Sequence, residues 1–221
     1  MLSAIDARQL EREIRLEYEA RCARYPDDNH LGWRLLYSPE DVLSEARLAF
    51  LGLNPGGSFV NPAHSVFSMA SGSAYDRTVE YWGASSVLQD QVMALFQRLG
   101  VQPERVLAGN LVPFRSPSED SLRDSAGAIS FGRSIWSKIL ASARPSIVIS
   151  MGGTANRAIS QLLGVHSIRS QNVGWGSYSA SRGKFSGGTW IGLPHLSRFS
   201  IMKREASQPA LKILFDGLND R

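Results

Sequence analysis

The chain has 221 residues, 43% of them hydrophobic and 20% charged, which excludes a disordered or collagen-like chain and favours one domain, or one domain with a small appendage. Its longest apolar run covers Leu48 to Leu53, about a third of the length that a membrane span needs, and its single cysteine, Cys22, excludes an internal disulfide and a cysteine-ligated zinc or iron–sulfur site. The net charge of +4 favours a polyanionic partner.

Helix-period patterns recur along the chain. The first helix is predicted over residues 3–24, where Leu10, Ile14 and Tyr18 follow one another at i, i+4 spacing, and it is expected to end at Tyr25-Pro26. Four further helices are predicted over residues 86–99, 120–143, 153–163 and roughly 201–216. Gly100, Arg144-Pro145 and Gly164 are expected to end the first three of these.

Short apolar runs without period-two alternation lie between the helices. Such runs are typical of strands that are covered on both faces. They occupy residues 47–53, 105–111, 146–151 and 189–193. A Gly- and Ser-rich segment over residues 174–188 is predicted to form a loop or a hairpin. Strands that alternate with helices predict an α/β domain with a mainly parallel sheet of four strands.

The ends of these strands are where a ligand is expected, because parallel sheets bind ligands beyond the carboxyl ends of their strands. Each segment that leaves a strand carries polar side chains or glycine. These segments are residues 54–58, 110–116, 152–154 and 194–200. We expect all four to meet along one rim of the sheet.

Basic residues are unevenly distributed. From Arg157 to Arg204 the chain has seven Lys or Arg residues and no Asp or Glu, whereas the first 45 residues mix both signs. The C-terminal third is therefore the predicted polyanion-binding face, and a merely solvated surface is the alternative.

The first rim segment reads Asn54-Pro55-Gly56-Gly57. Asn and Pro followed by two glycines form a tight turn that brings backbone N–H groups close to a ligand and aims an amide into the cleft. An amide orients water but is not a strong base. The same string also occurs as a purely structural turn, and the residues alone leave both interpretations open.

Asn110 lies at the end of one predicted strand and His195 follows another. A side-chain amide offers one acceptor and two donors, which match the edge of a pyrimidine such as uracil. A neutral imidazole can donate to a carbonyl oxygen that gains negative charge as a base leaves. The alternative for His195 is a hydrogen-bonded core histidine. His30, His64 and His166 have no spacing that indicates a metal site.

Four motifs in order resemble the uracil-DNA glycosylase superfamily from about residue 46 to about residue 216. They are Gly52-Leu53-Asn54-Pro55-Gly56, Gly109 to Arg115, Ile147 to Gly152 before a helix, and Leu193-Pro194-His195-Leu196-Ser197. The first is similar to the Asn-Pro-Gly motifs of the single-strand-selective monofunctional and mismatch-specific branches. The last is similar to the His-Pro-Ser loop, with Leu196 in place of the usual Pro.

The resemblance implies a three-layer α/β/α sandwich over residues 46–221, preceded by a helical extension over residues 1–45. It also implies roles for three side chains. Asn54 would position water or stabilise the sugar cation, Asn110 would read the flipped base, and His195 would stabilise the departing base anion. The base pocket would further include Gly52, Leu53, Pro55, Gly56 and Phe67.

Phe67 stands thirteen residues beyond Asn54, where the family places an aromatic ring that stacks on the base. Core packing is the alternative for Phe67. Gly56 occupies the position of a Tyr that blocks C5 substituents in the strictly uracil-specific branch, so the resemblance implies a pocket that is open near C5. A second glycine, Gly57, is expected to widen it further.

The family's DNA-contacting loop corresponds to Ser197, Arg198, Phe199 and Ser200. Phe199, four residues after His195, is expected to act as a wedge that fills the place of the flipped base, with Arg198 beside it on phosphate or the orphaned base. The alternative is that Phe199 is a core residue that anchors the final helix.

The expected activity is therefore hydrolysis of the N-glycosidic bond of uracil or a 5-substituted pyrimidine in single- or double-stranded DNA. No metal or organic cofactor is expected. The sequence places no amine directly beside the Asn54 turn, which disfavours a bifunctional mechanism through a Schiff base. The protein is expected to be a monomer. It is expected in the cytoplasm, because acidic and basic residues from Asp6 to Arg12 interrupt any signal-peptide pattern. Two alternatives are a glycosylase for a bulky modified base in viral DNA, acting in host defence, and a non-catalytic nucleic-acid-binding module.

Overall fold

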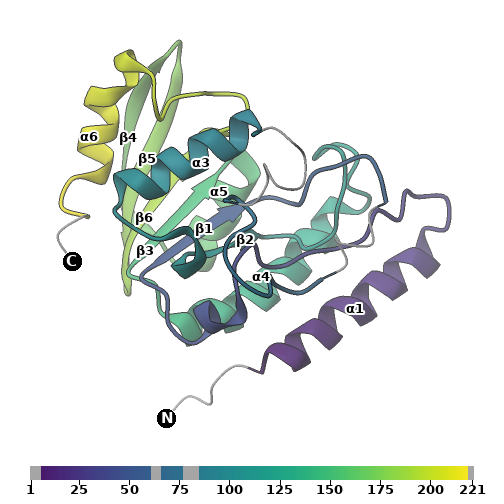
Figure 1. The fold of residues 1–221 in the computed structure, drawn as a ribbon. Helices are drawn as coiled ribbons and strands as arrows, with labels where there is room; N and C mark the ends of the chain where they lie inside the picture. Colours follow the sequence, from purple (N-terminus) through teal and green to yellow (C-terminus); the bar gives the residue numbers. More distant parts are fainter. Residues whose placement is uncertain (1–5, 61–65, 77–84, 219–221) are drawn as a thin grey trace.

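The computed structural model describes residues 6–60, 66–76 and 85–218, which form a six-stranded sheet in the order β2-β1-β3-β6-β5-β4 (Figure 1). The first four strands in this order are parallel to one another, as predicted. They are β2 (Leu107–Asn110), β1 (Leu48–Gly52), β3 (Ile147–Met151) and β6 (Gly188–Leu193).

The sheet continues from β6 into an antiparallel hairpin of β5 (Tyr178–Phe185) and β4 (His166–Trp175). It therefore has six strands and not the four predicted. Most residues of β4 are exposed, so this edge strand has no continuous apolar run that would identify it. The predicted hairpin in the Gly- and Ser-rich segment is confirmed, but its first strand begins eight residues earlier, at His166.

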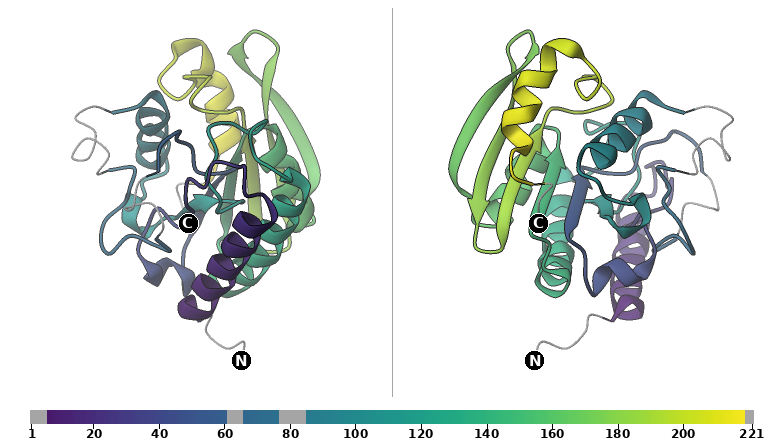
Figure 2. Two further views of the ribbon diagram at one scale, coloured as in Figure 1. Left: turned by 90° about the vertical axis from the view of Figure 1, so that its right-hand side faces the viewer. Right: turned by 60° about the vertical axis from the view of Figure 1, so that its left-hand side comes forward.

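Helices cover both faces of the sheet, which confirms the three-layer α/β/α arrangement (Figure 2). On one face, α1 (Ala7–Arg24), α4 (Ser125–Ala143) and α5 (Gly153–Leu162) pack on residues such as Ala49 and Leu51. On the other, α3 (Val87–Arg98) and α6 (Gln208–Phe215) pack on residues such as Leu48 and Phe50. Alternate residues of β1 thus enter opposite cores.

Local signals fix most helix ends. Asp6 caps α1 by accepting the backbone N–H groups of Arg8 and Gln9 over 2.9 and 3.3 Å, and Ser86 forms a capping box with Gln89 at the start of α3. Gly100, with φ of +62°, follows α3, and Arg144, with φ of +48°, ends α4 before Pro145. The predicted start of the first helix, at residue 3, lies outside the described residues.

The predicted C-terminal helix starts later than expected. It was predicted from about residue 201, whereas α6 begins at Gln208. Ile201 and Met202 are buried in the segment before it, so they contribute to the core without being helical. Pro209 lies in the first turn of α6, where its missing N–H costs no helical hydrogen bond.

The N-terminal segment packs on the sheet domain. Leu10 and Ile14 of α1 are buried in the first core, and Trp33 and Leu36 form single β-bridges with Phe114 and Gly109. The domain boundary predicted at residue 45 stays a prediction. Within residues 6–60, 66–76 and 85–218, the helices are too short or too polar to cross a membrane.

Candidate active site

The loops beyond the parallel strands lie together along one rim, as predicted from the motif positions. The Leu111 N–H donates to the Gly52 carbonyl over 2.9 Å, which joins the ends of β2 and β1. The Gly152 N–H donates to the Leu193 carbonyl over 3.0 Å, which joins the ends of β3 and β6. Asn54, Asn110 and His195 all follow or end these strands.

The Asn54 side chain is half-buried and held through its amide nitrogen. Nδ2 lies 2.8 Å from Ser116 Oγ, 3.3 Å from the Ser116 carbonyl and 3.1 Å from the Pro55 carbonyl. Because Ser116 Oγ donates its own hydrogen to the Ser118 carbonyl over 2.7 Å, it acts as an acceptor for Asn54. The donors of the Asn54 amide are thus used within the protein. None of the described residues donates to its oxygen, which can accept a hydrogen bond from a ligand.

Arg115 holds the rest of the Asn54 loop. Its guanidinium donates to the carbonyls of Gly56 at 3.0 and 3.2 Å, Leu31 at 2.8 Å and Phe59 at 3.1 Å. Gly57 has φ of +119°, and a Cβ there would overlap the Arg115 guanidinium. Gly57 therefore serves the loop backbone and makes room for Arg115. A Cβ at Gly56 would meet no heavy atom of the residues that the structure describes within 4 Å.

Asn110 is buried at the end of β2 and is 4% exposed. Its Nδ2 donates to the Tyr37 hydroxyl over 3.0 Å, and its carbonyl accepts the Trp136 indole N–H over 2.7 Å. Burial raises the pKa of Tyr37, so the phenol keeps its proton. A Cβ at Gly52 would overlap Asn110 Oδ1, which explains the glycine at that position. The amide keeps Oδ1 and one N–H for a ligand.

His195 presents a defined tautomer. Its Nδ1 accepts the backbone N–H of Ser197 over 3.3 Å and lies 2.8 Å from Ser197 Oγ. Because a backbone N–H only donates, Nδ1 carries no proton and the proton of the neutral ring is on Nε2. Burial lowers the pKa of His195 and the nearby Arg198 lowers it further, while Glu119 raises it. The ring is thus a neutral Nε2–H donor.

A buried polar network supports the His195 loop. The Asn156 amide donates to the Leu193 carbonyl over 2.9 Å, and Asn156 Oδ1 accepts from Ser150 Oγ over 2.8 Å. Ser150 in turn accepts the Trp190 indole N–H over 3.0 Å. This network fixes the main chain two residues before His195. A polar Ser150 in an otherwise apolar strand was the one sequence signal for it.

Sequence reasoning also missed two partners of the candidate residues. Tyr37 contacts Asn110 from the N-terminal segment, far from every motif. Ser116 contacts Asn54 from the end of the second rim segment. Both act through side-chain hydrogen bonds between distant parts of the chain, which no local pattern encodes.

The predicted base-stacking residue Phe67 is buried in the first core and is 4% exposed. Its carbonyl accepts the Leu36 N–H over 2.9 Å. Leu53 and Pro55 are buried as well. The pocket roles of these three residues stay predictions.

The predicted DNA-contacting residues divide into two kinds. Ser197 and Arg198 are exposed, whereas Phe199 and Ser200 are half-buried. The Phe199 ring lies against Tyr178 and Trp175 of the β4–β5 hairpin, with ring centroids 4.0 and 6.0 Å apart. The action of Phe199 as a wedge in DNA stays a prediction.

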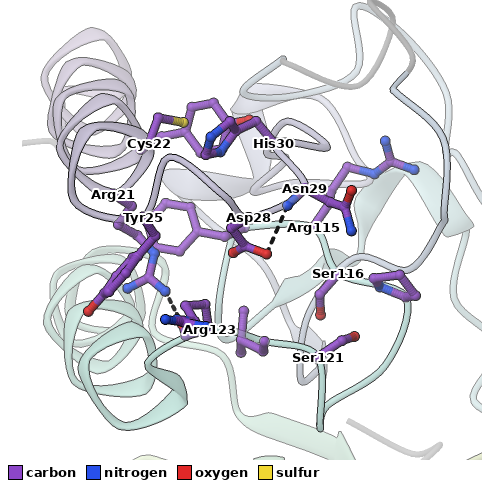
Figure 3. A pocket seen from close by; sticks show the side chains of 14 residues that line it. Arg21, Cys22, Tyr25, Asp28, Asn29, His30, Arg115, Ser116, Ser121 and Arg123 are labelled. Atoms are coloured by element: carbon purple, nitrogen blue, oxygen red, sulfur yellow. Dashed lines mark hydrogen bonds between the residues drawn. The ribbon is translucent and has the colours of Figure 1, made fainter.

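A small cavity of about 80 Å³ lies between α1 and the loop that follows Arg115, and Arg115 and Ser116, which hold the Asn54 loop, are part of its lining (Figure 3). Arg21 lines it and donates to the Arg123 carbonyl, while its Nη1 is 3.5 Å from an Asp124 carboxylate oxygen. Among residues 6–60, 66–76 and 85–218, His, Cys, Asp and Glu form no group of three or more that is arranged to hold a metal ion.

Comparison with protein families agrees with this geometry. The family model of the uracil DNA glycosylase superfamily matches residues 39–218. The chain belongs to this superfamily. None of the curated proteins compared with the chain matches it. Membership in the uracil DNA glycosylase superfamily supports a function of the DNA glycosylase type, with DNA as the partner.

Proposed function

We propose that the protein is a monofunctional DNA glycosylase that hydrolyses the N-glycosidic bond of uracil or a 5-substituted pyrimidine. The observation that carries this proposal is the tautomer of His195. A neutral imidazole with its proton on Nε2 is the donor that a departing base anion needs, and the Ser197 N–H sets that tautomer. The protein would act as a cytoplasmic monomer without a cofactor.

Base recognition falls to Asn110 in this proposal. Tyr37 takes one amide hydrogen, which leaves Oδ1 to accept the N3–H of uracil and the second N–H to donate to the O4 atom. The same edge matches thymine-like bases that carry a substituent at C5. It does not match cytosine, whose N3 is an acceptor and whose C4 amino group is a donor.

Bond cleavage starts with the base held out of the DNA stack. The bond between the sugar C1′ and the base nitrogen breaks, and its electron pair leaves with the base. His195 Nε2–H stabilises the negative charge that develops on the base oxygen. Water then forms a bond to C1′ and loses its proton to solvent, and the base anion takes up a proton.

Asn54 has the remaining role. Because Ser116 and Pro55 use the donors of its amide, the partial negative charge of Oδ1 is available to hold water and to stabilise positive charge on the sugar. An amide oxygen is a weak base. The proposal therefore places water attack late, when the sugar already carries positive charge.

A second candidate, a glycosylase for a bulky modified base in viral DNA, rests on the open position at Gly56. A Cβ at Gly56 meets no atom of the described residues within 4 Å, which supports a pocket that admits a large C5 substituent. Such an enzyme would serve host defence and not repair. The alternative of a non-catalytic binding module leaves the pairing of Asn54 and His195 on one rim without a purpose.

Mass spectrometry of released bases tests these candidates. The substrates are DNAs that contain uracil, 5-hydroxymethyluracil, hypoxanthine or glucosylated hydroxymethylcytosine. Release of uracil or 5-hydroxymethyluracil supports the proposal, and release of the glucosylated base alone supports the second candidate. Release of no base from any of them would contradict both and leave the binding module.

A further inference from the structure

The β4–β5 hairpin reaches past the edge of the sheet on which the candidate active site lies. Ser181 of β5 pairs with Gly192, next to the last residue of β6, yet β5 begins three residues earlier, at Tyr178. The turn between β4 and β5 therefore lies beyond the end of β6, on the side to which the His195 loop runs. Figure 2 shows the end of the hairpin beside the yellow segment that leads to α6.

Three aromatic rings and one guanidinium, here called the hairpin-tip cluster, gather at this end. Phe199 packs on Tyr178 and Trp175, at centroid distances of 4.0 and 6.0 Å. The Arg204 guanidinium lies 4.8 Å from the centre of the Trp175 ring, and its Nε donates to the Gly174 carbonyl over 3.2 Å. The cluster thus consists of Trp175, Tyr178, Phe199 and Arg204.

Tyr178 is the open ring of the cluster, because it is 48% exposed although it contacts Phe199. The turn that carries it is fixed. Asn172 Oδ1 accepts the Gly174 N–H over 2.8 Å, and its Nδ2 donates to the Gly176 carbonyl over 2.9 Å. A half-exposed aromatic ring on a fixed turn loses little conformational entropy when a flat ligand stacks on it.

The charge around the cluster identifies that ligand. Arg198, Lys203 and Arg204 are exposed, and the chain has no Asp or Glu between Arg157 and Arg204. Glu205, directly after Arg204, is the acidic residue next to the cluster in the sequence. Aromatic rings with several flanking cations are the arrangement that holds single-stranded nucleic acid, in which bases stack on the rings and phosphates meet the cations. Bases within a duplex already stack on both faces.

We propose that the hairpin-tip cluster binds an unpaired nucleotide that flanks the target base in single-stranded DNA, with Tyr178 as the stacking surface. The position of the hairpin next to the His195 loop makes the bound strand continuous with the candidate active site. That this nucleotide flanks a target base rests on the proposed function. Binding of an unpaired strand does not, because it requires no base excision.

Fluorescence anisotropy with a labelled oligothymidine of about 12 nucleotides, single-stranded or paired with oligodeoxyadenosine, tests the proposal without a target base. Tyr178→Ala should weaken binding of the single strand about 5- to 150-fold, the range expected for one lost stacking contact, and change duplex binding much less. Tyr178→Phe keeps the ring and should bind as the wild type does. Leu16→Ala, on the exposed side of α1, is the matched surface control.

Melting temperatures accompany each variant, and Arg204→Gln provides a second approach in case Tyr178→Ala does not fold. Loss of the Arg204 charge should lower the salt dependence of single-strand binding by about one unit of slope. Unchanged single-strand binding in folded Tyr178→Ala would overturn the proposal, as would an equal loss for single strand and duplex.

The outcome also separates this inference from the proposed function. If no DNA releases a base but Tyr178→Ala still weakens single-strand binding, the glycosylase proposal fails and the proposal for the hairpin-tip cluster stands. If uracil is released and Tyr178→Ala binds oligothymidine as the wild type does, the proposal for the hairpin-tip cluster fails and the glycosylase proposal stands. If both proposals hold, Tyr178→Ala should raise KM for a single-stranded uracil substrate and leave kcat unchanged.

Discussion

The side-chain nitrogen of Asn110 lies 3.0 Å from the hydroxyl oxygen of Tyr37 and donates a hydrogen bond to it. Tyr37 comes from a segment that precedes the first strand of the sheet, and Asn110 ends β2. The contact holds the amide in one place, and burial keeps the phenol protonated by raising its pKa. Under the proposed function, base recognition by Asn110 would therefore depend on a residue outside the four motifs.

Tyr37→Phe removes the oxygen that holds this amide. One buried N–H of Asn110 is then left without its partner, and the amide is free to turn its other edge to the base. We expect about a 10-fold loss of kcat/KM for uracil and a smaller preference for uracil over cytosine, measured as excision from matched single-stranded substrates.

Tyr75→Phe is the control for Tyr37→Phe. The Tyr75 ring packs on Tyr37 with centroids 5.2 Å apart, but no bond between its hydroxyl and Asn110 is present. This variant should keep both the rate and the base preference. A base preference in Tyr37→Phe equal to that of the wild type would remove Tyr37 from the recognition of the base.

Asn54→Ala should lower single-turnover excision by about 100-fold or more, because a preorganised polar group is lost next to the reacting carbon. DNA binding should change little. Ser116→Ala removes one acceptor that holds the Asn54 amide and should cause a smaller loss in the same assay. Full activity of Asn54→Ala would contradict the assignment.

The sequence predicted the parallel part of the sheet because its strands are buried on both faces. The strands β1, β2 and β3 are buried throughout, and such strands are continuous apolar runs. The edge strand β4 is mostly exposed and carries residues such as Arg169 and Ser170, so its extended conformation comes from pairing with β5. That pairing is a tertiary contact without a local pattern.

The candidate site divides in the same way. Asn54, Asn110 and His195 were found because each lies at or just after the end of a strand within a short motif. Tyr37 and Asn156 were missed because their contribution is a single hydrogen bond to a distant atom. Phe199 was expected as a wedge or as part of the core. Its contacts with β4 and β5 depend on the place of these two strands in the sheet, which the sequence did not predict.

The pH dependence of excision should follow His195. Burial and Arg198 hold its pKa below the usual value of 6.5, so the neutral ring persists at pH values below 6.5. We expect a constant single-turnover rate down to this pH and a decline only below it, where protonation of Nδ1 removes the bond from the Ser197 N–H. Arg198→Ala should move the decline to higher pH, and Glu119→Gln should move it to lower pH.

Stability should respond in the matching direction. Between the lowered pKa of folded His195 and about 6.5 in the unfolded chain, the unfolded state binds more protons. The free energy of unfolding should therefore fall as pH decreases through this window, by the contribution of this one group. NMR titration of the His195 ring measures the pKa directly. A value above 6.5 would contradict the neutral donor.

Gly56→Tyr tests whether the open position at residue 56 admits C5 substituents. Among the described residues, no heavy atom lies within 4 Å of a Cβ at this position, so a larger side chain should be tolerated in the fold. A Tyr ring there should obstruct the region near C5. We expect uracil excision to persist within about 10-fold, while excision of 5-hydroxymethyluracil falls by about 100-fold or more.

Gly56→Ala is the matched control for Gly56→Tyr, because it adds a single methyl group to the same backbone. It should keep both activities, since the Gly56 carbonyl still accepts from Arg115. Parallel assays with uracil and 5-hydroxymethyluracil in the same DNA sequence give the ratio of the two excision rates, which shows whether residue 56 lies near C5. If Gly56→Tyr lowers both activities equally, the side chain disturbs the loop, and the base pocket does not have its C5 wall at this position.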